Sequence, residues 1–482
     1  MVDVPRETPD DLVERYRQTR PFDRAETTLV TALVRRPDRL PRPLEHTLRW
    51  ALNLARLWIL RVDGEDLPVG PKLGAVRARI EALAERIGRL GEDLDPAGLA
   101  ADAHDLKPHL IEARAQLLLR LADRAPAALV DQQLAEKALV LVTGGGGGSG
   151  YVHLGTFALL ESLRITPRLV AGSSLGSVLG LFRARDLRYH EEMVRAVTHG
   201  LTFKRLFRVL EMESRFGVPG PLRLYLRSAL SRFFVGPSGH TLTVGELEIP
   251  FICVVSGIRR SLVRRDLSQY EAAFARELRR GAFGALLGVK DLITSWAQLM
   301  NDLVTTQGAL VPIPIGLDDE TRGFDVLDSV GFSCAVPALI HYDILRSDPR
   351  MEALMGTFMR RHQVDVLVDG GVSSNVPARF AWEAVQRGRL GTTNAFVLGL
   401  DCFAPQLRRN MLFLPIQRVA AQNVERDRAF AQLVFTHRKV PSPAALVPGP
   451  RVIGEATADG RDEVGQLAPF LLKMMEPIPA PT

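Results

Sequence analysis

The chain has 482 residues, of which 46% are hydrophobic and 24% charged, a composition typical of a folded soluble protein of two or three domains. Its net charge of +6 is compatible with an anionic membrane surface or with nucleic acid, but it requires neither. Aromatic residues make up only 6%, and the sequence has no zinc-finger spacing and no long basic arm. We therefore expect no nucleic-acid partner.

The cysteine count and the N-terminus indicate a cytoplasmic protein. Cys253, Cys334 and Cys402 are far apart and fit no metal-binding spacing, so we expect free thiols in a reducing compartment. The charged N-terminus lacks the apolar core of a secretion signal. No uninterrupted run of about 18 apolar residues is present, so no membrane span is expected.

Residues 1–135 are predicted to form a helical domain. The strongest evidence is a seam in which apolar residues alternate at spacings of three and four, which predicts a packed helix; its members are Leu73, Val76, Ile80, Leu83, Ile87 and Leu90. A turn at 91–96 and a second helical stretch follow, so an antiparallel hairpin is expected. Packing within a bundle is the expected role of the seam, and a homodimer through these helices is the alternative.

Residues 136–405 are predicted to form an α/β domain, followed by a helical and proline-rich extension over 406–482. Short apolar runs that alternate with helical stretches indicate a mostly parallel sheet covered by helices; the runs lie at 137–143, 167–174, 249–257, 364–371 and 395–401. Amphipathic helices are expected at about 200–235 and 268–307. The segment KVPSPAALVPGP, 439–450, is expected to lie on the surface.

Five consecutive glycines, 144–148, follow the first predicted strand. A flexible linker would have polar neighbours, whereas an apolar strand precedes these glycines and an amphipathic helix follows them. A dinucleotide site remains an alternative, because Gly145, Gly147 and Gly150 satisfy the G-x-G-x-x-G pattern, but the second strand ends without the acidic residue that such a site needs. The interpretation we favour is an oxyanion hole, in which backbone N–H groups face a developing negative charge.

A candidate nucleophile follows the second predicted strand. Gly172-Ser173-Ser174-Leu175-Gly176 is a G-x-S-x-G sequence between a strand and a helix, the context of a nucleophile elbow that exposes Ser174. The serine needs a base. One candidate is His437, as in the order Ser, acid, His. The other is Asp369, which ends the apolar run VDVLV and precedes two glycines.

The glycine run, the G-x-S-x-G elbow and the D-G-G sequence, in this order, resemble the patatin-like phospholipase family. The resemblance extends to HLGTFALLESL after the glycines, GSSLGSVLG at the elbow, SCAVPALI at 333–340 and DGGVSSNVPARFA at 369–381. It covers about 137–405. It implies a three-layer α/β/α domain with a mostly parallel central sheet, preceded here by the helical domain.

The resemblance also implies the residues of the site. Ser174 is expected to be the nucleophile and Asp369 the base of a dyad without histidine, and no metal or cofactor is implied. The oxyanion donors are expected among Gly146, Gly147 and Gly148. Supporting positions are Gly172, Gly176, Gly370, Gly371 and Asn375, which is expected to hold Asp369 in place. The activity implied is hydrolysis of fatty-acyl esters through an acyl-enzyme, with the protein bound peripherally to a membrane or lipid aggregate.

One departure from the family leaves the substrate open. The family commonly has a cation immediately before the last glycine of the loop, but this chain has Ser149. Phospholipids and neutral glycerolipids therefore both remain candidate substrates. Arginines at 259, 260, 264 and 265 could supply a cation, and 274–304 could form an interfacial helix or lid. The rival functions are a catalytically silent lipid-binding scaffold and a non-lipid esterase that uses His437.

Overall fold

The structure is a computed structural model that describes residues 9–209, 211, 213–237, 239–263, 298–303, 305–405 and 414–481. The chain forms two compact units. Unit 1 consists of Met1–Val140, Trp382–Val397 and Gln466–Thr482, and unit 2 of Leu141–Ala381 and Leu398–Gly465. The domain boundaries that the sequence suggests, at 135 and 405, stay a prediction.

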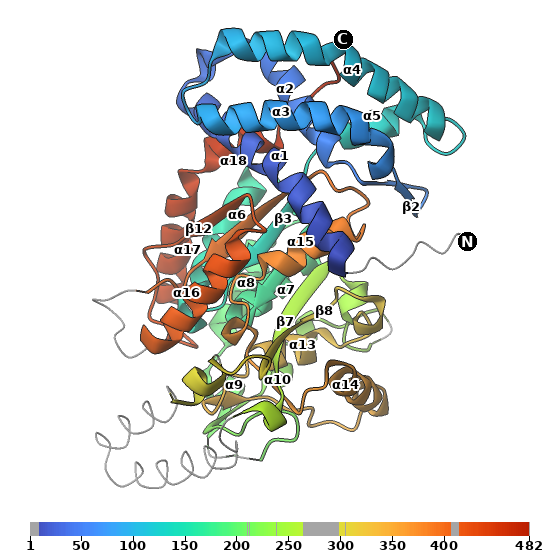
Figure 1. Cartoon of the computed structure of the whole chain (residues 1–482). Coiled ribbons are helices and arrows are strands. Elements are labelled where there is room, and N and C mark those ends of the chain that lie inside the picture. The colour runs from blue at the N-terminus through green and yellow to red at the C-terminus, as the bar shows by residue number, and fades with distance from the viewer. Residues whose placement is uncertain are drawn as a thin grey trace. The chain divides into compact units, whose positions relative to one another are not determined.

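Unit 1 is built mainly from helices, as the sequence predicts (Figure 1). They are α1 (Pro9–Arg35), α2 (Arg42–Arg56), α3 (Gly74–Leu90), α4 (Pro96–Leu121), α5 (Ala127–Ala135) and α18 (Ala468–Met475). The seam residues Val76, Ile80, Leu83 and Ile87 are buried in a core that α3 shares with α1, α2 and α4. Asp95 begins α4 by accepting the N–H of Gly98 at 3.1 Å, and α4 packs against α3. The antiparallel hairpin stays a prediction.

Unit 1 also contains a small β-hairpin that was not predicted. Its strands β1 (Ile59–Val62) and β2 (Glu65–Pro68) pair antiparallel. The turn residues Asp63 and Gly64 have φ angles of 50° and 84°. Positive φ at both central positions is the geometry that an Asp-Gly turn favours, so this dipeptide is the signal that could have identified the hairpin.

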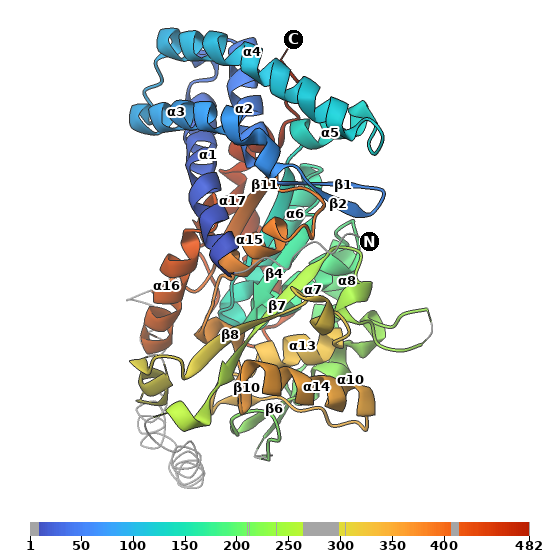
Figure 2. The same cartoon turned by 45° about the vertical axis from the view of Figure 1, so that its right-hand side comes forward.

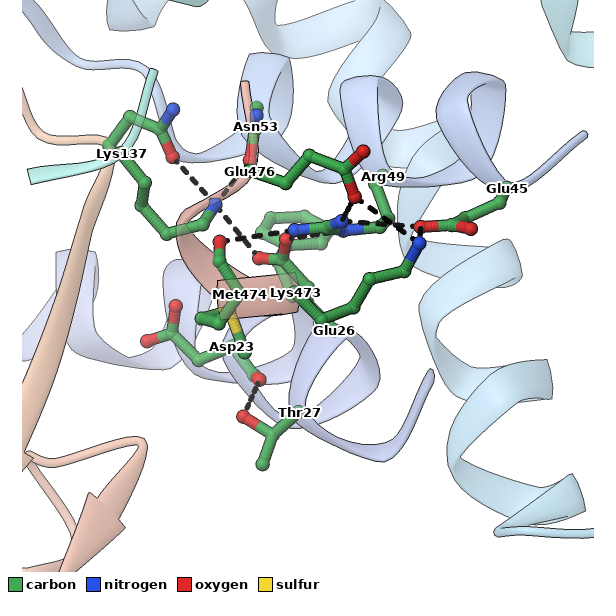
Figure 3. Close-up of polar contacts among 12 residues, drawn as sticks. Asp23, Glu26, Thr27, Glu45, Arg49, Asn53, Lys137, Lys473, Met474 and Glu476 are labelled. Carbon is green, nitrogen blue, oxygen red and sulfur yellow. Dashed lines mark hydrogen bonds and ion pairs between the residues drawn. The ribbon is translucent and has the colours of Figure 1, made fainter. Parts of the chain in front are cut away.

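Buried charges join the elements of unit 1 (Figure 3). Glu26 on α1 lies at the centre: its carboxylate is 3.3 Å from Arg49 and 2.7 Å from Arg56, both on α2. It is also 3.0 Å from the ammonium of Lys137, which immediately precedes β3. Arg49 is in turn 3.3 Å from Glu45. Each of these buried charges therefore has a partner of opposite sign, as burial in a low-dielectric interior requires.

A seven-stranded sheet lies mostly in unit 2, and the first residues of two of its strands fall within the bounds of unit 1. Its strands are β3 (Ala138–Thr143), β4 (Leu169–Ser173), β7 (Phe251–Ile258), β8 (Leu310–Ile315), β10 (Val366–Val368), β11 (Ala395–Asp401) and β12 (Leu433–Thr436), in the order β10-β7-β4-β3-β11-β12, with β8 also paired to β7. The pairs β4–β7 and β11–β12 are parallel, whereas β8 and β10 run antiparallel to β7.

Helices cover both faces of this sheet, which confirms the α/β fold class. The helices are α6 (His153–Ser162), α7 (Ser174–Arg185), α8 (Glu191–Gly200), α13 (Val326–Ser333), α14 (Pro349–His362), α15 (Ala378–Gln386), α16 (Leu414–Arg428) and α17 (Pro450–Gly465). Figure 2 shows α16 on one side of the strands and α8 on the other. The result is the three-layer arrangement that the sequence predicts. None of the described helices combines the length and the apolar character needed to cross a bilayer.

The prediction of amphipathic helices at about 200–235 is wrong for most of this stretch. This stretch forms the short helices α9 (Phe203–Leu206) and α10 (Leu226–Leu230) and the strands β5 (Phe207–Val209) and β6 (Leu222–Leu224); β6 also pairs with β9 (Ile340–His341). Between the two helices, Gly217-Val218-Pro219-Gly220-Pro221 interrupts any helical pattern. The missed strand β8, LVPIPI, contains two prolines, which is tolerated because it pairs with β7 alone. Arg264, Arg265 and most of 274–304 lie outside the described residues.

Candidate active site

Ser174 stands on a strained turn between β4 and α7. Its φ is 49°, a left-handed value that a residue with a side chain adopts only at an energetic cost. Two glycines make the turn possible. A Cβ on Gly176 would lie 2.4 Å from the carbonyl oxygen of Gly144, and one on Gly172 would lie 2.8 Å from the carbonyl oxygen of Gly176. The turn thus has the geometry of a nucleophile elbow, with Ser174 at the start of a helix.

Two serines hold the backbone of this turn. The N–H of Ser174 donates to the hydroxyl of Ser333 at 2.9 Å, and that hydroxyl donates to the carbonyl oxygen of Val254 at 2.6 Å. The hydroxyl of Ser177 donates to the carbonyl oxygen of Ser174 at 2.6 Å. Ser333 ends α13 and is fully buried. The side chain of Ser333, which lies far away in the sequence, therefore connects the backbone of Ser174 to strand β7.

Asp369 follows strand β10, which lies on the opposite side of β7 from the elbow strand β4. The strand before it, β10, is antiparallel to β7 rather than parallel, with Val368 paired to Ser256. On the other side of β7, Ser173 of β4 pairs with Val254. The prediction that Asp369 ends an apolar strand is right, but this strand does not run in the parallel direction that the prediction assumed.

The carboxyl group of Asp369 is buried and has an unusual pKa. Burial raises its pKa to about 7, and hydrogen bonds from the Ser174 side chain and from the N–H of Gly371 oppose this increase. The Gly371 bond to Oδ1 measures 2.7 Å. The hydroxyl of Ser174 is close enough to lower the pKa of this carboxyl group. Within the described residues, however, Oδ2 has no partner that meets the geometry of a hydrogen bond, so the hydroxyl is loosely aligned. Loose alignment is common in catalytic pairs without substrate.

The backbone around Asp369 is fixed on both sides. Its N–H donates to the carbonyl oxygen of Ala335 at 2.7 Å, and its carbonyl oxygen accepts the hydroxyl of Ser256 at 2.8 Å. A Cβ on Gly370 would lie 1.9 Å from the carbonyl oxygen of Val254, so only glycine fits. The segment after α13 thus supports Asp369, just as Ser333 supports Ser174.

The glycine loop passes directly over the elbow. A Cβ on Gly145 would lie 2.6 Å from the Cβ of Ser174, so a side chain here would displace the serine. Gly147 has a φ of 54°. Within the described part of the chain, the N–H groups of Gly146 and Gly147 have no backbone acceptor, whereas the N–H of Gly148 donates to the carbonyl oxygen of Pro443 at 3.0 Å. Gly148, one of the three predicted oxyanion donors, is therefore already engaged.

Asn375 joins the loop, the elbow and the D-G-G turn. Its carbonyl oxygen accepts the hydroxyl of Ser173 at 2.6 Å and the N–H of Gly145 at 3.3 Å. Its side-chain oxygen lies close to Gly371, because a Cβ on that glycine would be only 2.8 Å from this oxygen. The sequence predicts that Asn375 supports Asp369, and its backbone also connects the other two parts of the site.

A narrow apolar cavity of about 120 Å³ opens onto Ser174. Ser174 and Gly147 both line it, and the remaining wall is formed mainly by aliphatic and aromatic side chains from α7, α8 and the region 201–230, with Cys334, Val336 and Leu446. None of its described lining residues carries a charge. Such a cavity suits an alkyl chain, because each buried methylene group contributes about 0.8 kcal/mol. No group of three or more metal-binding side chains occurs within the described residues.

Comparison with known families agrees with this geometry. The sequence model of the patatin-like phospholipase family matches residues 141–382, about half of the chain. The chain belongs to the patatin-like phospholipase family. Among curated proteins, no relative matches it. Family membership supports lipid acyl hydrolysis in general and identifies neither the substrate nor the catalytic residues.

Ser149, the departure from the family pattern, has a structural role in this patatin-like protein. Its side chain is fully buried, and its hydroxyl donates to the carbonyl oxygen of Gly146 at 2.6 Å. The position that commonly holds a cation therefore stabilises the glycine loop from inside. Arg259 and Arg260 do not replace that cation, because neither lines the cavity; Arg259 instead donates to the carbonyl oxygen of His362 at 3.2 Å.

His437, the alternative base, faces other partners. Its Nδ1 is 3.3 Å from Glu463, and its ring centroid is 5.7 Å from that of His153. Burial lowers the pKa of His437 to about 4. Burial lowers the pKa of His153 to about 3, and its Nε2 lies 2.9 Å from the carbonyl oxygen of Gly144. Within the described residues, neither histidine has a hydrogen bond to Ser174.

Two parts of the site were not predicted from the sequence. The first is Ser333: it begins the SCAVPALI stretch of the family resemblance, but no role at the site was expected for it. The second is 442–446, expected on the surface: a Cβ on Gly148 would lie 2.4 Å from the carbonyl oxygens of both Ser442 and Ala445. Leu446 also lines the cavity, and its carbonyl oxygen accepts the hydroxyl of Tyr151 at 3.1 Å. A run of small residues and prolines opposite a glycine run is the available sequence signal, but it is weak.

Ser333→Ala is expected to lower kcat by roughly 10-fold or more without raising KM for a small soluble ester, because it releases the backbone of the nucleophile while the cavity is unchanged. The matched control is Ser329→Ala. Ser329 lies on the same helix, is equally buried, and donates only to the carbonyl oxygen of Asp325 within its own helix. Steady-state kinetics and thermal unfolding of both variants provide the check. Equal losses of kcat in the two variants would contradict a positioning role for Ser333.

Proposed function

We propose that this protein hydrolyses fatty-acyl esters of glycerolipids with Ser174 as nucleophile and Asp369 as base. The observation that carries the proposal is the meeting of three features at one point: a serine on a strained turn, a buried carboxyl group with a pKa of about 7 beside it, and an uncharged apolar cavity that begins at the serine. Scaffold proteins have no need of a strained serine at the entrance to a cavity.

The proposed reaction has two halves. The hydroxyl of Ser174 gives its proton to the carboxylate of Asp369 while Oγ attacks the ester carbonyl carbon. The N–H groups of Gly146 and Gly147 receive the oxyanion, helped by the N-terminus of α7. The alkoxide of the leaving alcohol takes the proton from Asp369, and an acyl-enzyme remains. Water then gives its proton to Asp369 and attacks the carbonyl carbon of the acyl-enzyme. The bond to Ser174 Oγ breaks, Asp369 returns the proton to Oγ, and the fatty acid is released.

The decisive experiment is labelling with a fluorophosphonate, followed by peptide mass mapping. We expect the label on Ser174, no label in Ser174→Ala, and slow or absent labelling in Asp369→Asn. His437→Ala should keep most labelling, since its ring faces Glu463. If the folded protein in the presence of vesicles stays unlabelled, Ser174 is not activated, and the silent lipid-binding scaffold becomes the better interpretation.

A second experiment compares a substrate that has a phosphate head group with one that has none. The lining of the cavity carries no charge, which favours recognition of the acyl chain over recognition of a phosphate. Release of fatty acid from phosphatidylcholine and from triacylglycerol, each dispersed in the same detergent, measures this preference. Comparable rates with both would agree with selection by the chain alone.

A further inference from the structure

Residues 202–209, TFKRLFRV, form a segment with two different faces. The segment consists of the short helix α9 (Phe203–Leu206) and the strand β5 (Phe207–Val209). Within it Leu206 and Phe207 are buried, whereas Thr202, Phe203, Lys204, Arg205, Arg208 and Val209 are exposed. We call it the basic-apolar segment.

The inner face of the basic-apolar segment is part of the wall of the cavity. Leu206 and Phe207 line the same cavity as Ser174. The ring of Phe203 lies outside this wall and contacts it, with its centroid 4.9 Å from that of Phe207. The segment therefore lies between solvent and the space that the acyl chain would occupy.

The outer face combines exposed apolar and cationic side chains. Phe203 is 45% exposed and Val209 59%, values that are high for large apolar residues. Lys204, Arg205 and Arg208 are exposed beside them, and the segment contains no acidic residue. Within the described part of the chain, none of these three cations forms an ion pair with a carboxylate, so their charge is not compensated locally.

Three contacts keep the arginines on this face. Arg205 donates to the carbonyl oxygen of Gly200 at 3.1 Å. Arg208 donates to the carbonyl oxygen of Lys204, and its guanidinium lies 5.2 Å from the ring centroid of Tyr225. Because these acceptors are neutral, both guanidinium groups keep their charge and have further N–H donors available for an external anion.

We propose that the basic-apolar segment docks this protein on an anionic lipid surface. Phe203 and Val209 enter the boundary between head groups and acyl chains, while Lys204, Arg205 and Arg208 contact anionic head groups, the arrangement that interfacial segments adopt. This inference rests on the proposed function, because it places the wall of the acyl cavity against the lipid that supplies the acyl chain. The charge selects an anionic surface over a neutral one.

The test is co-sedimentation of the full chain with vesicles of phosphatidylcholine alone and of phosphatidylcholine mixed with phosphatidylglycerol. We expect tight binding to the anionic vesicles only, and weaker binding as salt is added. The variant Lys204→Gln/Arg205→Gln/Arg208→Gln should bind the anionic vesicles about 100-fold more weakly, given the typical contribution of each cation near such a surface. Phe203→Ser should also weaken binding, but without changing its salt dependence.

A variant with the same change in net charge serves as the matched control. Arg17→Gln/Arg36→Gln/Arg451→Gln removes three exposed cations that lie outside the segment and the site, and it should bind anionic vesicles like the unaltered protein. If the control variant loses as much binding as the segment variant, net charge is responsible and the proposal fails. It also fails if the segment variant still binds with unchanged affinity.

Hydrolysis of a monomeric p-nitrophenyl ester tests the proposed hydrolase function independently of the docking proposal. The segment variant should keep its rate on the soluble ester and lose its rate on lipid in anionic vesicles. A protein that hydrolyses the soluble ester but binds no vesicle would overturn the docking proposal alone. A protein that binds anionic vesicles through the segment but hydrolyses no ester would overturn the proposed function and leave the docking surface in place.

Discussion

Asp369→Asn is expected to lower kcat by roughly 10²–10⁴-fold and to make the folded protein more stable above pH 7. The loss of activity follows from the removal of the proposed general base, because the contribution of such a group is typically of that size. The gain in stability follows from burial, which penalises the charged carboxylate and raises the pKa of Asp369 to about 7. The neutral amide has almost the same shape and escapes this penalty.

The pH dependence of the stability gain identifies its cause. A carboxyl group whose pKa is higher in the folded than in the unfolded protein destabilises the fold increasingly as pH rises from about 4 to about 7, and by a constant amount above that. The difference in unfolding free energy between Asp369→Asn and the unaltered protein should therefore grow over this window, up to roughly 4 kcal/mol. Urea unfolding at several pH values measures it.

Ser174→Ala is the control for this experiment. It should abolish activity without the pH-dependent gain in stability, because the ionisable carboxyl group remains. In the unaltered protein, kcat/KM for a soluble ester should rise with pH and level off above about 7, since only the carboxylate can accept the proton from Ser174. A level profile down to pH 5 would mean that Asp369 is ionised there and would contradict the raised pKa.

The local parts of the site could be predicted from the sequence. A strand, a glycine and a serine before a helix produce the elbow, because the close contact between Gly176 and the Gly144 carbonyl leaves no room for a side chain. The same applies to the D-G-G turn, where Gly370 lies against the Val254 carbonyl. Each of these positions admits only glycine, so the requirement leaves a motif in the sequence even though the neighbouring carbonyl belongs to a distant part of the chain.

Contacts between distant parts of the chain could not be predicted. Ser333 and Ser174 are separated by 159 positions, and only the paths of β7 and α13 bring them together. The antiparallel direction of β10 depends equally on pairing with β7, which a strand of three residues does not encode. Gly148 was predicted as an oxyanion donor because nothing in a glycine run shows that the Pro443 carbonyl will take its N–H.

Glu26→Gln is expected to destabilise unit 1 by about 3–5 kcal/mol, the second large effect. Burial alone would raise the pKa of Glu26, but the charges of Lys137, Arg56 and Arg49 outweigh it and hold the pKa at about 2. The neutral amide would leave these three buried cations without their shared counter-ion. Removing one partner of a buried ion pair is strongly destabilising, because the opposite charge stays buried without compensation.

The control for Glu26→Gln lies on the same helix. Glu14→Gln alters an exposed pair, 3.9 Å from Arg17, and should change stability by less than about 1 kcal/mol. Because the pKa of Glu26 is lowered by folding, its contribution should be complete above about pH 4.5 and should disappear as the pH falls towards 2. Hydrogen exchange read by peptide mass would locate the loss in α1, α2 and the start of β3. Equal destabilisation by the two variants would mean that the cations around Glu26 find other partners or water.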